Sequence, residues 1–259
     1  MSEKSGEAAI AETVHRRAAK GGLIGGVSFA VNLGLNVVQV PLLLRFWPQE
    51  TYGLWLSVGA LATLLTTLDG GHQLYIGNLL NRSYVEDREQ FRITLASAVQ
   101  VTALTSAAQV VLALVFCFSG LASRWLDIAL SDSASYALAV VIYTAGWIAT
   151  GSIGSVLVRL FPPTGHVVRS TYWAIAMRVV QFAAVCLAAC LGWGIVGTSM
   201  SFVAATTLWA ILLFLDLGRL YPEYTPWWRG GSLRIGLRNF VRSGVVSIVA
   251  ILDLVSLKA

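Results

Sequence analysis

Residues 22–44 read GLIGGVSFAVNLGLNVVQVPLLL, a run of 23 residues without one charged side chain. About 20 apolar residues in a helix are enough to span the hydrocarbon core of a bilayer. Five further runs of similar character cover residues 52–80, 93–119, 136–160, 172–191 and 194–215. A seventh, residues 243–257, has only 15 residues and carries Asp253. The sequence therefore predicts an all-α, polytopic membrane helical bundle with six spanning helices and a partial seventh.

The overall composition supports a membrane protein. Apolar residue types make up 56% of the 259 residues and charged types only 12%, and the mean hydropathy is +0.72. Soluble domains carry about 25% charged residues, so this composition cannot cover a soluble globule with polar groups. Nine Trp, ten Phe and eight Tyr with so little charge also exclude a disordered chain. The lipid bilayer is therefore the first expected partner.

The positive charges are unevenly distributed between the two sides of this predicted bundle. Fourteen of the 18 Lys and Arg fall in the N-terminal tail and in the second, fourth and sixth connections, whereas Arg45 and Arg124 fall in the opposite set. Cytoplasmic loops of membrane proteins carry an excess of positive charge. We therefore expect both ends of the chain in the cytoplasm. The same distribution explains the net charge of +5 without a nucleic-acid partner.

Four segments follow from these patterns. Residues 1–20 form a cytoplasmic tail or a short interfacial helix, and the sequence leaves both interpretations open. Residues 21–217 form the six-helix transmembrane lobe. Residues 218–242 hold two Pro, two Trp and five Arg, which is typical of a basic cytoplasmic linker that touches anionic headgroups. Residues 243–259 form a truncated seventh helix.

The first predicted span carries a polar stripe. It consists of Ser28, Asn32, Asn36 and Gln39, which are four, four and three residues apart and so lie on one helical face. Amide and hydroxyl groups are costly to bury among acyl chains without partners, so this face should meet other helices or a watery cavity. Two interpretations stay open: hydrogen bonds that hold the bundle together, or the wall of a path for a polar substrate.

Ionisable residues interrupt two of the predicted spans. Asp69 and His72 flank two glycines in the second span, and Arg178 lies in the fifth with Gln181 about one turn further on. Charged groups at such depth usually line a cavity or form pairs. We hypothesise that Asp69 and Arg178 face each other or a common aqueous cavity. The alternative is that Asp69 caps a broken helix while Arg178 extends towards the interface.

His72 is the histidine that falls within a predicted span. Its imidazole would titrate near neutral pH, so it is either a candidate proton carrier or a hydrogen-bonded packing residue. Together with the groups above it completes the set of candidate residues for a substrate path: Asn32, Asn36, Gln39, Asp69, His72, Arg178 and Gln181.

Catalytic chemistry has no visible place in the sequence. Residues 192–197, GWGIVG, match the dinucleotide-binding pattern G-x-G-x-x-G, but they lie between two predicted membrane helices and not after a strand. The three Cys all lie in apolar runs, and the chain has no H-E-x-x-H and no C-x-x-C. The sequence therefore predicts no cofactor, no metal site and no enzyme activity.

Several motifs resemble a known family. They are Trp47-Pro48-Gln49-Glu50-Thr51, the following Tyr52-Gly53-Leu54-Trp55, Asp69-Gly70, Asn78, the charged loop at residues 86–92 and the loop RLFPPTGH at residues 159–166. Together they resemble the N-terminal half of the polysaccharide flippases, which include O-antigen and exopolysaccharide translocators. These proteins belong to the same superfamily as multidrug and toxin extrusion transporters and the lipid II flippase.

The resemblance implies two six-helix lobes around a central cavity in the bacterial inner membrane, with the N-terminus in the cytoplasm. It implies an undecaprenyl-diphosphate-linked oligosaccharide as the substrate, moved between leaflets by alternating access, and polysaccharide polymerase or assembly proteins as further partners. Arg178 is the matching candidate for attracting the diphosphate, and Asp69 or His72 for coupling an ion. A cation-coupled multidrug efflux protein and a non-transporting membrane scaffold remain the alternatives. One lobe implies either a truncated product or the association of two copies.

Overall fold

The computed structural model of the chain describes residues 2–67, 69, 71–121, 124 and 130–256. Every regular element in these ranges is a helix, which confirms the predicted all-α bundle. The longer helices are α1 (Ser2–Phe46), α2 (Gln49–Thr67), α3 (His72–Glu86), α4 (Arg88–Phe118), α6 (Leu130–Gly146), α8 (Val167–Cys190), α9 (Ile195–Leu220) and α10 (Leu233–Ser256).

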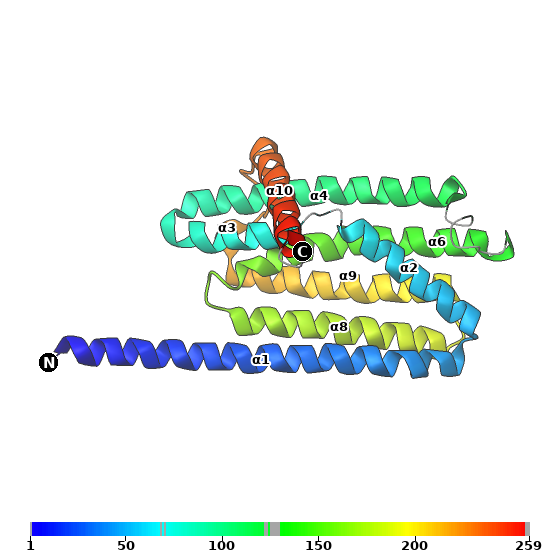
Figure 1. Cartoon of the computed structure of the whole chain (residues 1–259), viewed down its shortest axis with the longest axis horizontal. Helices are drawn as coiled ribbons and strands as arrows, with labels where there is room; N and C mark the ends of the chain where they lie inside the picture. Colours follow the sequence, from blue (N-terminus) through cyan, green and yellow to red (C-terminus); the bar gives the residue numbers. More distant parts are fainter. Residues whose placement is uncertain (1, 68, 70, 122–123, 125–129, 257–259) are drawn as a thin grey trace.

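Most helices run side by side, up and down the long axis of the molecule, whereas α10 crosses this axis (Figure 1). Helix α1 packs against α8, α8 against α9, α9 against α6, and α6 against α4. Helix α3 packs against α4, and α10 lies on both of them. Because consecutive helices alternate in direction, the ends that the positive charges assign to the cytoplasm meet at one end of the bundle.

Four helical stretches are long and apolar enough to cross a membrane: Ile24–Phe46, Arg88–Phe118, Val167–Cys190 and Ile195–Leu220. The predicted second span is a bent pair, α2 and α3, which meet at 48° and together pass the same test. The predicted fourth span, residues 136–160, is helical throughout but divided. Helix α6 is followed by a π-helical turn (Trp147–Ser152), the short helix α7 (Ile153–Leu157) and a 3₁₀ turn (Val158–Leu160).

Two boundaries differ from the expectation. Helix α1 begins at Ser2 and runs to Phe46, so residues 2–20 and the first predicted span belong to one helix. Helix α10 begins at Leu233, ten residues before the expected seventh helix, because the non-helical linker ends sooner. That linker contains Pro222, Pro226 and Gly230, and the φ of Gly230, 82°, is left-handed. Proline and a left-handed glycine both interrupt a helix. Neither occurs in the described residues after residue 232, so a helix can begin there.

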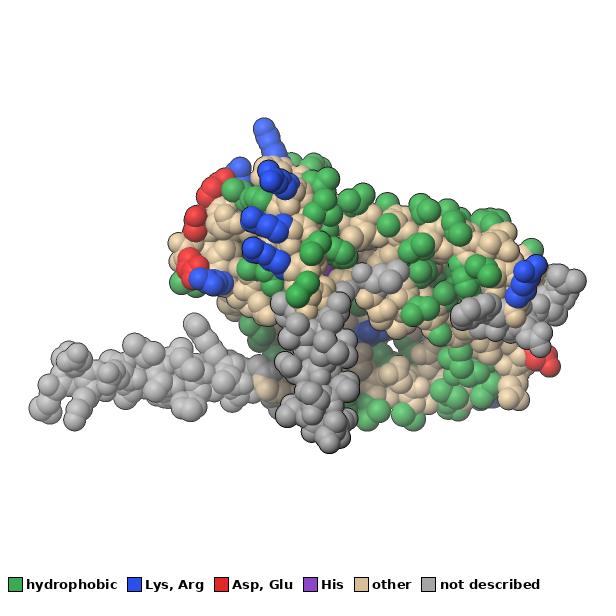
Figure 2. Space-filling view, turned by 45° about the horizontal axis from the view of Figure 1, so that its top comes forward, with side chains coloured by type: hydrophobic (Ala, Val, Ile, Leu, Met, Phe, Trp, Pro, Cys, Tyr) green, Lys and Arg blue, Asp and Glu red, His purple; other side chains and the backbone are tan. Residues whose placement is uncertain are grey.

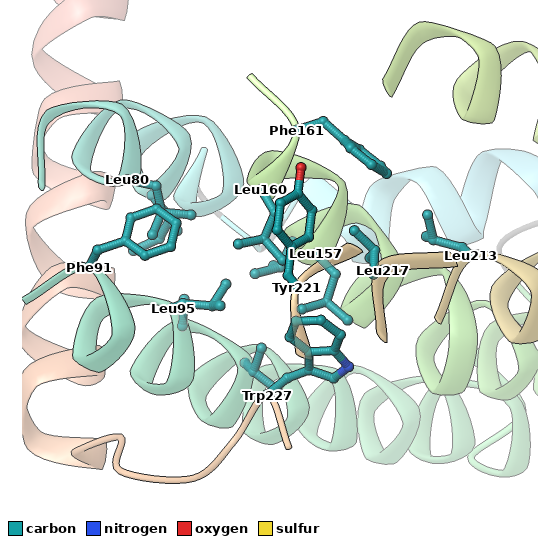
Figure 3. Packing of buried hydrophobic residues seen from close by; sticks show 14 of the residues in the cluster. Leu80, Phe91, Leu95, Leu157, Leu160, Phe161, Leu213, Leu217, Tyr221 and Trp227 are labelled. Carbon is teal, nitrogen blue, oxygen red and sulfur yellow. The ribbon is translucent and has the colours of Figure 1, made fainter. Parts of the chain in front are cut away.

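The largest hydrophobic core among the described residues lies near the end of the bundle where α3 ends and α4 begins. Side chains from α3, α4, α7, α9 and the linker meet there, and Figure 3 shows ten of them labelled: Leu80, Phe91, Leu95, Leu157, Leu160, Phe161, Leu213, Leu217, Tyr221 and Trp227. A second cluster near the opposite end joins α1, α2, α8 and α9 through Leu43, Trp55, Val185 and Phe202.

Candidate functional site

A cavity of about 340 Å³ lies among α1, α2, α6, α8 and α9. Its polar wall consists of Asn32, Asn36, Gln39, Thr63, Tyr143, Arg178 and Gln181. Five of the seven residues that the sequence suggested for a substrate path therefore line one space. Among the described lining residues, Arg178 carries the formal charge, so the cavity is cationic.

The polar stripe of α1 turns towards this cavity over most of its length. Asn36 and Gln39 line it, and neither side-chain amide has a hydrogen-bond partner among the described residues. The Asn32 amide nitrogen donates to the Ser28 carbonyl oxygen at 2.9 Å, within the same helix. Ser28 itself lines a neighbouring pocket near α8. Two amides in the cavity are thus free to bind a polar ligand, because no described helix uses them for packing.

Arg178 lies near the middle of α8, and its side chain is exposed to the cavity. It forms no ion pair with a described residue, since the pairs found there involve other arginines. Tyr143 on α6 is close enough to interact electrostatically with Arg178. The guanidinium therefore offers its donors to the cavity and is available to an anionic ligand.

Gln181 has a different role from the other amides. Its side chain is only 5% exposed, and its amide nitrogen donates to the Thr206 hydroxyl on α9 at 3.0 Å. That hydroxyl donates in turn to the Phe202 carbonyl oxygen at 2.8 Å. Of the two interpretations, a hydrogen bond between helices describes Gln181 better. Its amide borders the cavity but is hydrogen-bonded from α8 to α9.

Aromatic rings form the remaining wall of the cavity. Trp55 meets Tyr143 edge-on with ring centres 5.8 Å apart, and Tyr143 stacks on Phe202 at 4.2 Å. The sequence reasoning missed these three residues as cavity lining. Trp55 belongs to the Tyr-Gly-Leu-Trp motif and had a signal, whereas Tyr143 and Phe202 lie in apolar runs that do not distinguish them.

A second, separate pocket of about 260 Å³ contains Asp69. Its other polar lining residues are Thr66, Gln73, Thr102, Thr105, Ser106, Gln109 and Ser152. Those on α4 lie at helical spacing, the same kind of signal as the stripe of α1, and the sequence reasoning did not use it. The Thr102 hydroxyl is buried and has no hydrogen-bond partner among the described residues. This pocket is rich in oxygen atoms, and Asp69 is its charged lining residue.

The hypothesis that Asp69 and Arg178 pair or share a cavity is corrected by this arrangement. They line different pockets, and no ion pair joins them within the described part of the chain. Asp69 shares its pocket with Thr102, Thr105, Ser106 and Gln109 of α4, and no described residue of α8 lines it. The backbone N–H of Gln73 donates to the Asp69 carboxylate at 3.4 Å, as expected of the alternative in which Asp69 caps the start of α3.

His72 lines neither pocket. Its side chain is fully buried, and its ring lies 5.4 Å from that of Phe240 on α10. Neither ring nitrogen has a hydrogen-bond partner among the described residues. The expected hydrogen-bonded packing is therefore only half correct, because the imidazole packs without the bonds.

The architecture is similar to that of solved membrane transporters. One is a MOP superfamily transporter from Pyrococcus furiosus Vc1 (DSM3638), with a TM-score of 0.64 and 14% identity over 87% of this chain and 50% of that one. Its binding pocket is described as having reverse polarity, which suggests a different function for that protein. Another is an outward-facing multidrug resistance MATE family transporter of the MOP superfamily, with a TM-score of 0.50 and the same identity and coverage.

The chain thus spans about half the length of the solved structures it matches, and it has the fold of one half of a MOP superfamily transporter. No protein-family model and no curated protein matches the sequence. The likeness concerns the fold, and the substrate has to be argued from the residues of the cavity.

Proposed function

We propose that the chain is one lobe of a flippase that translocates an undecaprenyl-diphosphate-linked oligosaccharide across the bacterial inner membrane for O-antigen or exopolysaccharide synthesis. The observation that carries this proposal is the cavity at the middle of the bundle, in which Arg178 is the charged lining residue. An unpaired cation at this depth favours an anionic cargo, because a charge within the membrane is retained where a partner or an aqueous path stabilises it.

The chemistry of the cavity suits both parts of such a substrate. Arg178 would bind the diphosphate, since a guanidinium matches phosphate oxygens with two parallel N–H donors. The free amides of Asn36 and Gln39 would hydrogen-bond sugar hydroxyls, and the rings of Trp55 and Tyr143 would cover the apolar faces of the sugars. The polyprenyl chain would stay in the lipid, because the cavity is far too small to hold it.

A second lobe completes this proposal. Transporters built from repeated lobes bind their substrate at the interface between the repeats. Since the chain spans half the length of the solved structures it matches, the opposite wall of the cavity would come from a further six-helix lobe or from a second copy. Polysaccharide polymerase or assembly proteins would act on the delivered lipid, with the N-terminus of this lobe in the cytoplasm.

The pocket around Asp69 favours cation coupling as a part of the same function. One carboxylate, four hydroxyl-bearing neighbours from α4 and the π-helical turn, and the C-terminal end of α2 provide oxygen atoms and negative potential. We therefore propose that Na⁺ or a proton binds at Asp69. In the purified chain, Na⁺ should raise the melting temperature over choline at equal ionic strength, and Asp69→Asn should remove the difference. An unchanged difference in that variant would exclude this site.

A cation-coupled multidrug efflux protein is the alternative within transport, since the MATE fold is equally consistent with the chain. It would require an acidic cavity for organic cations, and the acidic residue here lies in the smaller pocket. A non-transporting scaffold would instead act through the linker. Deleting residues 221–232 would then abolish the cellular phenotype, while neutralising Asp69 and Arg178 would leave it intact.

The decisive experiment follows leaflet exchange in proteoliposomes. A fluorescent polyprenyl-diphosphate oligosaccharide is incorporated together with this chain and a complementary lobe, and its accessibility to a membrane-impermeant quencher is measured over time. We expect exchange with the wild-type chain and a loss of at least tenfold with Arg178→Gln. Exchange that is unaffected by this substitution would exclude Arg178 as the diphosphate-binding residue. Transport of organic cations with no exchange of the lipid would contradict the flippase and favour the efflux protein.

A further inference from the structure

Helix α10 has three different faces along its described part, residues 233–245. One face packs on the protein: Asn239 and Ser243 are buried, and Phe240 covers the ring of His72. At Gly236, a Cβ would lie 2.6 Å from the Ser97 carbonyl oxygen, so only glycine allows α10 to approach α4 this closely. This contact fixes the rotation of α10 and thereby determines which residues face outwards.

The second face is an exposed apolar stripe. Leu233, Leu237, Val241 and Val245 follow one another at intervals of four residues, and all are exposed, Val241 by 64%. The third face is basic: Arg234, Arg238 and Arg242 follow the same interval, one position later. A helix with adjacent apolar and basic faces lies in the membrane interface, with the apolar side chains at the acyl boundary and the arginines at the headgroups.

A pocket of about 220 Å³ lies where the basic face meets α3 and α4. Arg82, Arg238 and Arg242 line it together with the Glu86 carboxylate and with polar side chains such as Gln90. Arg82 is already neutralised by Glu86, with a separation of 2.9 Å. Arg238 and Arg242 form no ion pair with a described residue, so two positive charges of this pocket are uncompensated.

The distribution of positive charges puts the pocket on the side of the membrane that we expect to be cytoplasmic. Its lining residues come from most of the length of α3, from the first two turns of α4 and from the first half of α10, at the end of the bundle to which the positive charges assign the cytoplasm. Figure 2 shows blue Lys and Arg side chains gathered at this end, with red Asp and Glu side chains and green apolar side chains next to them. Basic pockets between helices on the cytoplasmic side are suited to phosphate headgroups.

We propose that this pocket binds the phosphodiester of one anionic phospholipid from the cytoplasmic leaflet, with an acyl chain along the apolar stripe of α10. Arg238 and Arg242 would contact the phosphate oxygens, and Val241, which lies between them in sequence on the neighbouring face, would contact the chain. The site is distinct from the Arg178 cavity, which lies among other helices. It anchors α10 and the linker at the inner leaflet whether or not the lobe transports an oligosaccharide.

The test counts lipids that remain bound to the purified chain in native mass spectrometry, with phosphatidylglycerol and phosphatidylcholine of equal acyl chains as probes. We expect preferential retention of phosphatidylglycerol. Arg238→Gln with Arg242→Gln should weaken this binding about 30-fold, which corresponds to about 2 kcal/mol at roughly 1 kcal/mol for each basic residue at the surface. The matched control, Arg45→Gln with Arg124→Gln at the opposite end, should keep wild-type affinity.

Two further variants separate charge from folding and lipid from free phosphate. Arg238→Lys with Arg242→Lys keeps the charges and should retain most of the binding, which a merely misfolded Gln variant could not explain. Val241→Asn should weaken phosphatidylglycerol but not inorganic phosphate. Equal retention of phosphatidylcholine, an equal loss in the control variant, or competition by inorganic phosphate at the same concentration as the lipid would each overturn the proposal.

Discussion

Replacing Arg178 by glutamine removes the charge of the central cavity and keeps a polar side chain there. Hydrogen bonds to charged groups contribute about 1.5–3 kcal/mol. Because the Arg178 side chain is exposed to the cavity and therefore partly screened, we take the lower end of this range. At about 1.4 kcal/mol for each tenfold change, Arg178→Gln should weaken the binding of a diphosphate ligand by about tenfold.

Equilibrium binding of a fluorescent polyprenyl diphosphate to the purified chain in detergent measures this change without a second lobe. Arg178→Lys keeps the charge but loses the two-pronged geometry, and we expect an intermediate affinity. Arg45→Gln is the matched control, since Arg45 lies at the far end of α1 and does not line the cavity. Raising the salt concentration should weaken diphosphate binding by the wild-type chain more than binding by the Arg178→Gln variant.

Two results would refute the reasoning. If Arg178→Gln binds the diphosphate as tightly as the wild-type chain, the cavity does not hold the charged part of the substrate. If Arg45→Gln loses as much affinity as Arg178→Gln, the effect belongs to the net charge of the protein. If the wild-type chain binds an organic cation more tightly than the diphosphate, the efflux hypothesis is favoured over the flippase.

Four further substitutions test the packing on which the sites depend. Gly236→Ala would put a Cβ 2.6 Å from the Ser97 carbonyl oxygen. We expect α10 to shift and the free energy of unfolding, measured by thermal melting, to fall by about 1–3 kcal/mol. Gln181→Leu and Thr206→Val each break the hydrogen bond between α8 and α9. A double-mutant cycle on the free energy of thermal unfolding should give a coupling energy of about 0.6 kcal/mol, and a coupling energy of zero would show that the bond does not stabilise the protein. Asp216→Asn removes the carboxylate that accepts bonds from an arginine and a tryptophan of α8; since the arginine is half-exposed, we expect a loss of about 1 kcal/mol, measured by chemical denaturation.

The spans and the amide stripe could be predicted from the sequence because their physical causes are local. A charge-free run of helical length has to cross the bilayer, and amides spaced along one helical face have to avoid lipid. Asn36 and Gln39 therefore lie in the cavity as the spacing indicated. Arg178 joined them for the same reason, since an arginine in the middle of an apolar helix needs a polar environment.

The neighbours of these residues could not be predicted, because they depend on the directions of whole helices. Asp69 lies between α2 and α3, two helices that meet at 48°, and it lines a pocket with residues of α4. The glycines indicated a break but not its direction. The start of α10 at Leu233 was also not predicted from the sequence. A hydropathy window averages over all sides of a helix, so the basic and the apolar face of this segment together resemble a linker.

The separation of Asp69 from Arg178 removes the expected ion pair and leaves two pockets of opposite charge in one lobe. One segment borders both of them: Tyr143 on α6 lines the cationic cavity, and Trp147, one turn later in the π-helical turn, lines the acidic pocket. π-helical turns are irregular and occur frequently at functional sites. A ligand affects a distant site only by favouring one conformation of what lies between. An anion at Arg178 and a cation at Asp69 would therefore communicate through the shape of this turn, and not through direct attraction between two fixed charges.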